Sequence, residues 1–570
     1  MTNPIYTIIR RLRSPLIVLI VVNAISVLGF VLIPGVDDQG KPWSMTFFHA
    51  FYFVSYMGTT IGFGEIPYAF TNAQRYWALV TMYATVVAWL YGIGMLLSVF
   101  QDKIFLNQLK KNTFSRKIKN IREPFFIICG YGDTGVQLTR LLSEEGILSI
   151  VIDTSEESIH DLQSDDFKVS PIGLCDDASQ SEVLEMAGIC NPYCEGIISI
   201  VNDDTVNLTV AIVTQLLNPK LRLIARAETP EAEANILSFG ANEVINPFEI
   251  FASRMALAMQ SPGLYSIYDW TTGATGEKIK EPPTLLPGIW IICEFGRFGR
   301  ALYESLENKN VTLRYIEDDR THSDLPSGSV IGRATEAPSL VKAGIVDAVG
   351  IIAGTRNDAN NLSIILTATE LNPHLFRVVR QNKDKNSHLF NSASYEMLMQ
   401  RGSIISNTIF AFIRTPMLGD FLRIVSRFND DKANELVSRI VGVIEDDEAQ
   451  IWEFKVNAKE SPALFKKLKS SHLLVSDILK CHSDVNLGAY CSNKRLSAMP
   501  LFMKRNNGNV LLPEDDRDIL IDDRVLMCGS KNAYLQMQQI LNYEEVLEQV
   551  LTGKDMPSSS FGRWFKRINN

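Results

Sequence analysis

The chain has 570 residues, a length that suits three or four domains of about 150 residues each. It is 46% hydrophobic and 21% charged, a balance that excludes a largely disordered protein. The net charge of −9 disfavours nucleic acid as a partner, because binding phosphates requires concentrated positive charge.

Two long apolar segments predict two membrane spans. Residues 14–33 and 76–101 contain no charged side chain, and each is long enough to cross the hydrocarbon core. Three arginines precede the first span and a basic stretch follows the second, whereas the connection between them carries only Lys41 and Arg75 as cations. The positive-inside bias predicts a multi-pass protein of the inner (plasma) membrane, in contact with lipid, with both termini in the cytoplasm.

The connection between the spans predicts a short helix over residues 44–57. Ser44 is its expected N-cap, and Pro42 lies just before it. A helix of this length cannot cross the membrane, so we expect it to enter and return. The glycine-rich segment 59–65 follows. Peptide carbonyls in such a segment can replace the water around a cation, and glycine permits the backbone angles this requires.

Residues 59–65 resemble the T-T-V-G-Y-G-D selectivity filter of potassium channels. The order span, pore helix, filter, span resembles the two-helix members of that family. The resemblance implies K⁺ in the filter, a pore domain over residues 1–105 and assembly as a homotetramer. Phe63 replaces the usual Tyr and Glu65 the usual Asp, so a weakly selective cation channel is the alternative. The implied filter residues are Thr59, Thr60, Ile61, Gly62, Phe63, Gly64 and Glu65.

The inner span lacks a glycine about 20 residues after the filter, where many such channels bend. Gly92 and Gly94 lie lower in the span, and we expect them to form the hinge, with Leu97 near the cytoplasmic constriction. The alternative is that the two glycines serve close helix packing.

Residues 106–122 are polar and basic and indicate a linker. After them, short apolar strands alternate with helical stretches, a pattern typical of parallel α/β units. The strand at 125–129 leads into Gly130-Tyr131-Gly132-Asp133-Thr134-Gly135, and the next strand ends at Asp153. This G-x-G-x-x-G spacing lets backbone approach a diphosphate at a helix N-terminus, and Asp153 can accept hydrogen bonds from a ribose.

Parts of this sequence are repeated about 155 residues later. Residues 202–208 are similar to residues 357–362, and residues 217–219 are similar to residues 371–373. The chain therefore contains a duplicated domain. The two copies resemble RCK domains (regulators of potassium conductance, or TrkA-N), and the end of the chain resembles their TrkA-C-like lobe. The expected parts are the first RCK domain at 123–280, the second at 281–440, the lobe at 441–545 and a tail at 546–570.

The RCK resemblance implies an octameric cytosolic ring in the tetramer, with NAD or ADP/ATP as a regulatory ligand. Asp177 and Ala178 join the expected nucleotide site of the first copy. In the second copy Glu294 stands where the first glycine should be, and Arg297 can offset its charge. Whether that second cleft binds a ligand stays open. Its candidate residues are Glu294, Phe295, Gly296, Arg297 and Glu317.

Some RCK channels bind calcium through two acids in an I-A-E-A-E segment. Here the matching segment ends in Arg226-Ala227-Glu228, and Arg226 suits a nucleotide phosphate better than a cation. Asp203, Asp204 and Glu228 can still offer oxygen ligands to Ca²⁺, and a solvated acidic cluster is the alternative.

The sequence thus predicts an α-helical two-span membrane pore domain followed by two tandem α/β Rossmann-like RCK domains and a small α+β C-terminal lobe. The expected function is a ligand-gated potassium channel. A membrane-anchored dehydrogenase is disfavoured, because no histidine lies near either glycine turn and the repeat has no added substrate domain. We therefore expect no enzymatic activity.

Overall fold

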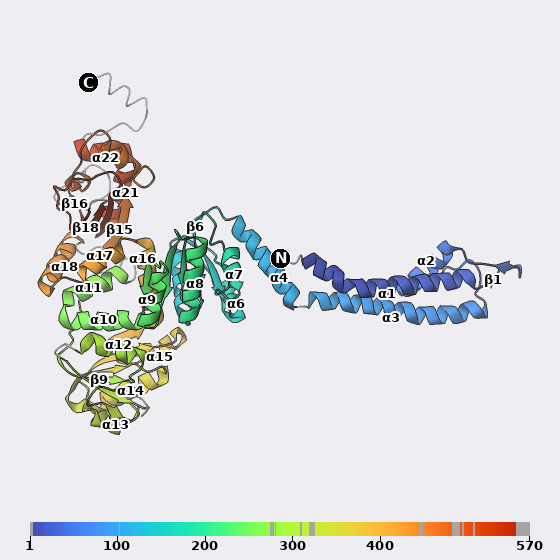
Figure 1. Ribbon diagram of the computed structural model, residues 1–570, viewed down its shortest axis with the longest axis horizontal. Coiled ribbons are helices and arrows are strands. Elements are labelled where there is room, and N and C mark those ends of the chain that lie inside the picture. Colours follow the sequence, from blue (N-terminus) through green and yellow to red (C-terminus); the bar gives the residue numbers. More distant parts are fainter. Residues whose placement is uncertain are drawn as a thin grey trace, which may run out of the picture. The chain divides into compact units, whose positions relative to one another are not determined.

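The computed structural model describes most of the chain, which divides into two compact units, Met1–Ile121 and Arg122–Asn570. Figure 1 shows the elements of each unit. The part of the expected tail beyond residue 553 lies outside the described residues. The described residues are 4–101, 103–273, 279, 281–307, 311–318, 325–444, 449–480, 491–492, 495–505 and 508–553.

The first unit is built on two long helices, α1 (Pro4–Leu32) and α3 (Asn72–Phe100). Both contain windows long and apolar enough to cross a membrane, Arg13–Leu32 and Asn72–Ser98. The short strands β1 (Gly35–Val36) and β2 (Pro42–Trp43) pair antiparallel between them. Much of the apolar surface of α1 and α3 is exposed in the single chain, as expected of helices that face lipid or other copies.

The short helix α2 (Phe47–Gly58) packs against both long helices. Its N-cap is Thr46 rather than the predicted Ser44, and the Thr46 hydroxyl accepts a hydrogen bond from the His49 amide. The core of this unit joins Val27 and Phe30 of α1 to Ala50 and Val54 of α2. The Trp77 indole donates to the Ser26 carbonyl at 3.1 Å, which ties α3 to α1.

The predicted linker is helical: α4 spans Lys103–Lys119. Its last turn carries Arg116, Lys117 and Lys119, and cations there are favoured by the helix dipole. The basic composition that indicated a linker therefore also suits the C-terminal end of a helix.

The second unit begins with a six-stranded parallel sheet in the order β5-β4-β3-β6-β7-β8, the doubly wound arrangement predicted from the sequence. Its strands are β3 (Phe125–Cys129), β4 (Leu148–Asp153), β5 (Ile172–Cys175), β6 (Cys194–Ser199), β7 (Arg222–Arg226) and β8 (Glu243–Ile245). Its helices are α5 (Asp133–Glu144), α6 (Glu156–Ser164), α7 (Ser181–Met186), α8 (Asp204–Leu217) and α9 (Pro230–Ser238).

The second copy repeats this topology as β11-β10-β9-β12-β13-β14, which confirms the predicted duplication of the fold. Its strands are β9 (Gly288–Cys293), β10 (Val311–Glu317), β11 (Val330–Ile331), β12 (Ala348–Ala353), β13 (Phe376–Gln381) and β14 (Met397–Gln400). Its helices are α12 (Arg297–Leu306), α13 (Ala337–Lys342), η1 (Ile345–Asp347), α14 (Asp358–Leu371), η2 (Asp384–Asn386) and α15 (Ser387–Asn391).

The two copies exchange the helices that follow their sheets. Helix α10 (Pro247–Gln260) follows the first sheet but packs on α12, with Phe248 and Phe251 in the apolar core of the second copy. Helix α16 (Arg401–Arg414) follows the second sheet but packs on α5, where Ile405 and Ile409 enter the core of the first copy. Each Rossmann core is thus completed by its neighbour, and the carboxyl ends of the two sheets come close to one another.

The remaining helices and an antiparallel sheet follow the two Rossmann cores. The sequence predicted a C-terminal lobe at 441–545, whereas the apolar core of this sheet also includes residues within 264–270 and 417–440, which were assigned to the RCK domains. The sheet runs β15-β20-β18-β19. Its strands are β15 (Ala449–Lys455), β18 (Ala498–Arg505), β19 (Gly508–Leu511) and β20 (Arg524–Ser530), and the short β16 (Cys491–Ser492) and β17 (Arg495–Leu496) pair separately. The helices are α11 (Pro262–Thr272), α17 (Leu418–Val425), α18 (Asp430–Ile444), α19 (Pro462–Leu468), α20 (Val475–Ile478), α21 (Lys531–Asn542) and α22 (Glu544–Thr552), the last of which passes the predicted lobe boundary at 545.

Candidate functional site

The predicted filter has an alternating backbone. Positive φ angles recur at every second residue, at Thr60 (62°), Gly62 (68°) and Gly64 (76°). Left-handed and right-handed residues in alternation turn successive carbonyls toward the same side, which is what a row of cation ligands requires. A left-handed conformation costs a β-branched residue such as Thr60 about 1–2 kcal/mol, so this strain marks a functional constraint.

The helix α2 holds both ends of the filter. The amides of Ile61 and Gly62 donate to the Tyr56 carbonyl at 3.1 and 3.3 Å, which anchors the inner end. The Tyr56 hydroxyl donates to the Glu65 carbonyl at 2.9 Å, and the Tyr52 hydroxyl donates to the Glu65 carboxylate at 3.3 Å. Sequence reasoning did not identify these two tyrosines. Phe63 has no hydroxyl, and the bonds from Tyr52 and Tyr56 to Glu65 hold the outer end of the filter instead.

The candidate hinge lies within the unbroken helix α3. A Cβ at Gly92 would meet only Leu19 Cδ1, at 3.9 Å, and a Cβ at Gly94 would meet nothing within 4 Å. Close packing inside one chain therefore does not explain either glycine. Leu97 is 54% exposed in the single chain, and its role at the constriction stays a prediction.

The glycine turn of the first copy, Gly130–Gly135, connects β3 to α5 as predicted. Gly130 has a φ of 103°, and a Cβ on Gly135 would lie 2.3 Å from the Gly130 carbonyl oxygen. Gly132 caps α5, and a Cβ there would meet nothing within 4 Å, so its backbone is open to a ligand. Thr134 is buried in the first turn of α5.

Asp153 holds this turn in place. Its carboxylate accepts from the amides of Tyr131 at 2.6 Å and Ser155 at 2.8 Å. Beyond β5, Asp177 accepts from the Ser179 amide at 2.8 Å, and Ala178 is buried. Asp153 therefore lies beside the turn, where a ribose would be expected, with part of its acceptor capacity already used.

The first phosphate turn is negatively charged at its helix. Asp133 is the first residue of α5, and burial and then the neighbouring Asp384 raise its pKa. Asp384 comes from the second copy, beyond β13. The charge of Arg401 opposes this shift, so the turn offers a ligand backbone amides, a ribose acceptor and one nearby cation beside two carboxylates.

The second phosphate turn follows the same path with other side chains. Glu294 occupies the position of Gly130 and adopts a φ of 76°, while Gly296 caps α12 as Gly132 caps α5. Glu317 accepts from the Phe295 amide at 2.7 Å, just as Asp153 accepts from Tyr131. The candidate residues of the second cleft thus form a turn between strand and helix, as in the first copy. The side chain of Glu294 stands where Gly130 has only a hydrogen atom.

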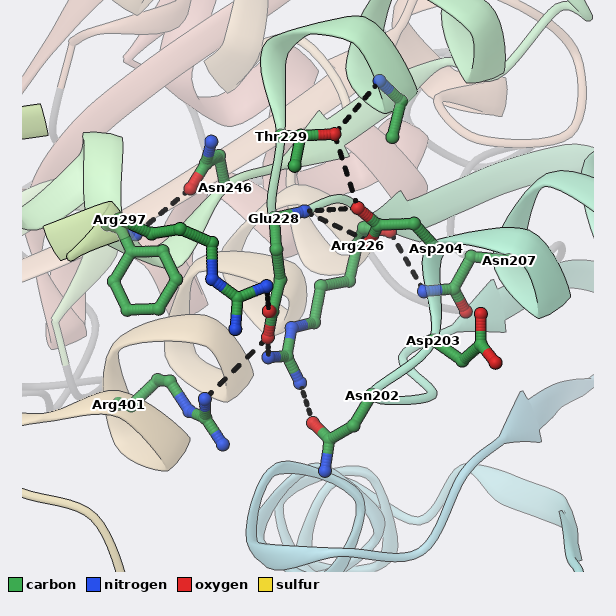
Figure 2. Close-up of polar contacts among 12 residues, drawn as sticks. Asn202, Asp203, Asp204, Asn207, Arg226, Glu228, Thr229, Asn246, Arg297 and Arg401 are labelled. Atoms are coloured by element: carbon green, nitrogen blue, oxygen red, sulfur yellow. Dashed lines mark hydrogen bonds and ion pairs between the residues drawn. The ribbon is translucent and has the colours of Figure 1, made fainter. Parts of the chain in front are cut away.

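Glu228 joins the two copies through arginines, as Figure 2 shows. It follows β7 of the first copy, and its side chain is only 8% exposed. It pairs with Arg226, with Arg297 at the start of α12, and with Arg401 of α16 at 3.7 Å. Arg226 is itself buried and also donates to the Asn202 side chain. The Arg226 guanidinium is therefore engaged by Glu228 and Asn202 in this structure, and its use as a phosphate ligand stays a prediction.

The predicted calcium ligands do not gather. Asp203 caps α8 by accepting from the Thr205 amide, and Asp204 accepts from the Glu228 amide at 3.1 Å. The Glu228 carboxylate is taken up by arginines. Among the described residues no group of three or more His, Cys, Asp or Glu side chains is placed to hold a metal ion, so this candidate site has no support.

A cavity of about 210 Å³ lies in the second cleft. Four arginines line it, and Arg356, Arg380 and Arg401 were not singled out in the sequence. Arg380 stands 154 residues after Arg226 at the end of the equivalent strand, so the repeat itself could have identified it. The lining residues are Phe248, Glu294, Gly296, Arg297, Phe298, Gly299, Gly354, Arg356, Arg380, Asn382 and Arg401.

Comparison with known proteins agrees with this division of the chain. The ion-channel family model matches residues 17–102, and the TrkA-N domain model matches 126–247 and again 290–400. The chain is 26% identical over 220 residues to Potassium channel protein 1 of Methanocaldococcus jannaschii and 28% identical over 229 residues to Probable potassium channel protein 2 of the same organism. Each match covers 38% of this chain, and 64% and 62% of the relatives, so the chain spans less than two thirds of either one.

Solved structures include similar chains. The GsuK channel bound to NAD aligns over 94% of this chain and 99% of its own, with 15% identity and a TM-score of 0.43. The GsuK structure bound to ADP covers 74% of this chain and 99% of its own, with 19% identity and a TM-score of 0.41. The chain thus contains an ion-channel domain followed by two TrkA-N domains, and it is similar in sequence to the two Methanocaldococcus jannaschii potassium channel proteins.

Proposed function

We propose that this protein conducts K⁺ through the filter at Thr59–Glu65. The observation that carries the proposal is the alternation of positive φ angles at Thr60, Gly62 and Gly64. It supports a row of carbonyl oxygens able to replace the hydration shell of a cation. One chain supplies one filter segment, so a closed pore requires several copies, and we propose a homotetramer with eight RCK domains in a ring.

The ring is proposed to gate the pore in response to a nucleotide. The intact turn Gly130–Gly135 and the neighbouring Asp153 support NAD or an adenine nucleotide in the first cleft. Such a ligand shifts the gate only through a difference in affinity between two shapes of the ring. The basic residues that flank the two spans support cytoplasmic termini, which would place the ring inside the cell.

The decisive experiment is planar-bilayer recording of the purified protein with NAD, ADP, ATP and Ca²⁺ applied in turn to the side that carries the RCK domains. We expect K⁺ current whose open probability changes with NAD or an adenine nucleotide. Equal permeability to Na⁺ and K⁺ would replace this proposal with the weakly selective cation channel that Phe63 and Glu65 suggest. A current indifferent to every ligand would refute the gating part alone.

We also propose that the nucleotide acts as a regulator and not as a redox substrate. Incubating the protein with NADH and candidate carbonyl substrates should leave the absorbance of NADH unchanged. Substrate-dependent oxidation would instead point to the dehydrogenase alternative.

A further inference from the structure

The cavity in the second cleft concentrates positive charge. Arg297, Arg356, Arg380 and Arg401 line it, against one lining carboxylate, Glu294. Glu228 pairs with two of these arginines but shares its charge with Arg226 as well. The described groups therefore leave an excess of cations around the cavity.

Arg380 is the most confined of these cations. It is 7% exposed, and its guanidinium lies 5.3 Å from the Phe248 ring centre and 5.8 Å from that of Phe298. One terminal nitrogen donates to the Gly354 carbonyl at 3.2 Å, while its Nε has no partner among the described residues. Burial and then the nearby Arg401 lower its pKa to about 10. Arg380 is thus a largely desolvated cation that lines the cavity, and such a cation favours an anion beside it.

The backbone of the turn offers donors to the same space. Gly296 caps α12, and no side chain caps that helix end. A Cβ on Gly296 would meet nothing within 4 Å, so the first amides of the helix are accessible from the cavity. Helix N-termini favour anions through these amides and through the helix dipole. The arginines and the amides thus point to the same ligand charge independently.

The size of the cavity sets the ligand class. Its volume of about 210 Å³ is below the roughly 300–1,000 Å³ typical of pockets that enclose whole organic ligands. Glu294 occupies part of the turn where a dinucleotide would cross. A phosphate or diphosphate group fits both the volume and the charge better than a complete dinucleotide.

We propose that the second cleft binds a phosphate or diphosphate group through Arg297, Arg356, Arg380 and Arg401, and that this anion competes with Glu228 for Arg297 and Arg401. Because Glu228 belongs to the first copy and these two arginines lie on α12 and α16, anion binding weakens an ion-pair link between the copies. The first cleft and its nucleotide are not needed for this step, so the inference goes beyond the proposed function.

The test is calorimetric titration of the full-length protein in detergent with inorganic pyrophosphate at constant ionic strength. Inorganic phosphate and ADP form separate arms that distinguish a free anion from the diphosphate of a nucleotide. The arms are run with wild type and with Gly135→Ala, which disrupts the first turn, so that binding in the two clefts can be separated. We expect about one pyrophosphate per chain in both proteins.

Three variants decide the assignment. Arg356→Gln, at an exposed loop position that does not threaten folding, and Arg380→Gln should each weaken pyrophosphate binding by roughly tenfold or more. Arg333→Gln removes the same charge from a side chain of the second copy that is 68% exposed and outside the cavity, and it should leave affinity unchanged. Glu228→Gln should tighten binding several-fold, because it removes the competing carboxylate.

The Glu228 variant separates competition from a merely structural role. If Glu228 only shapes the cleft, its loss weakens binding or leaves it unchanged, and either result overturns the competition. Absence of pyrophosphate binding, or equal effects of the Arg333 and Arg356 variants, overturns the site itself. These measurements require no ion current, so their failure is distinct from failure of the proposed channel function.

Discussion

The hydrogen bond from Tyr56 to the filter makes a sharp test of the pore. Tyr56→Phe keeps the ring, which packs against Phe53, and removes only the hydroxyl that donates to the Glu65 carbonyl at 2.9 Å. A neutral hydrogen bond contributes about 0.5–1.5 kcal/mol net, so each subunit loses about 1 kcal/mol of filter bracing. We expect the outer end of the filter to loosen and discrimination against Na⁺ to fall.

The expected loss of discrimination can be expressed as a shift in reversal potential. Moving one charge through 100 mV corresponds to about 2.3 kcal/mol, so about 1 kcal/mol of lost discrimination shifts the reversal potential by roughly 40 mV. The assay is the reversal potential in planar bilayers with K⁺ on one side and Na⁺ on the other. The shift should move toward the value for a non-selective pore.

Tyr52→Phe is the matched control on the same helix, one turn away. Tyr52 donates at 3.3 Å to the exposed Glu65 carboxylate and not to the backbone, so its loss should shift the potential by much less. A filter unaffected by Tyr56→Phe, or one more sensitive to Tyr52→Phe, would show that the hydroxyl of Tyr56 does not brace the backbone.

Three further substitutions test other parts of the chain. Gly29→Ala places a Cβ about 2.1 Å from the Trp77 indole, so α1 and α3 must move apart. Size-exclusion chromatography in detergent should then show loss of the assembled protein, and an unchanged elution profile would contradict this contact. Gly135→Ala pushes against the Gly130 carbonyl and should weaken calorimetric binding of NAD or ADP in the first cleft by roughly tenfold or more, whereas unchanged affinity would move that ligand elsewhere. Asp523→Asn breaks the buried pair with Arg505 and should destabilise the C-terminal lobe by about 3–5 kcal/mol in denaturant titrations, against less than about 1 kcal/mol for Asp515→Asn at an exposed pair; equal effects would refute the role of burial.

Local patterns were sufficient for much of the architecture. Uncharged apolar runs of spanning length predicted α1 and α3, and the turn Gly130–Gly135 between a strand and a helix predicted the first Rossmann unit. The start of α2 was predicted at the wrong residue, because Ser44 and Thr46 are both good caps and only the fold selects Thr46. The helix over Lys103–Lys119 was missed because basic residues suit both a linker and a helix C-terminus.

The exchange of α10 and α16 could not be read from local pattern, because amphipathic helices do not specify which copy they cover. That exchange is what brings Arg401 and Glu228 to the second phosphate turn. Arg226 was assigned to a ligand from its position in a motif. In the structure its side chain is buried and forms an ion pair with Glu228. The sequence therefore predicted where the clefts lie but not how each one is charged.

The two clefts have diverged in charge at equivalent positions, and this difference has a measurable consequence. The first residue of the phosphate helix is Asp133 in one copy, with Asp384 beside it, and Arg297 in the other, while Arg401 acts on both clefts. A ligand of the first cleft must rely on backbone amides and on Asp153, whereas an anion in the second relies on charge that salt screens with a length of about 10 Å at 0.1 M.

Raising NaCl from 50 to 300 mM should therefore weaken pyrophosphate binding severalfold while nicotinamide or adenine nucleotide binding in the first cleft changes little. Equal salt dependence of the two affinities would mean that the charge difference between Asp133 and Arg297 does not govern what the clefts bind. Both turns come from one duplicated domain. In that case, the change of a single residue at the start of the helix would not be enough to give the two clefts different ligands.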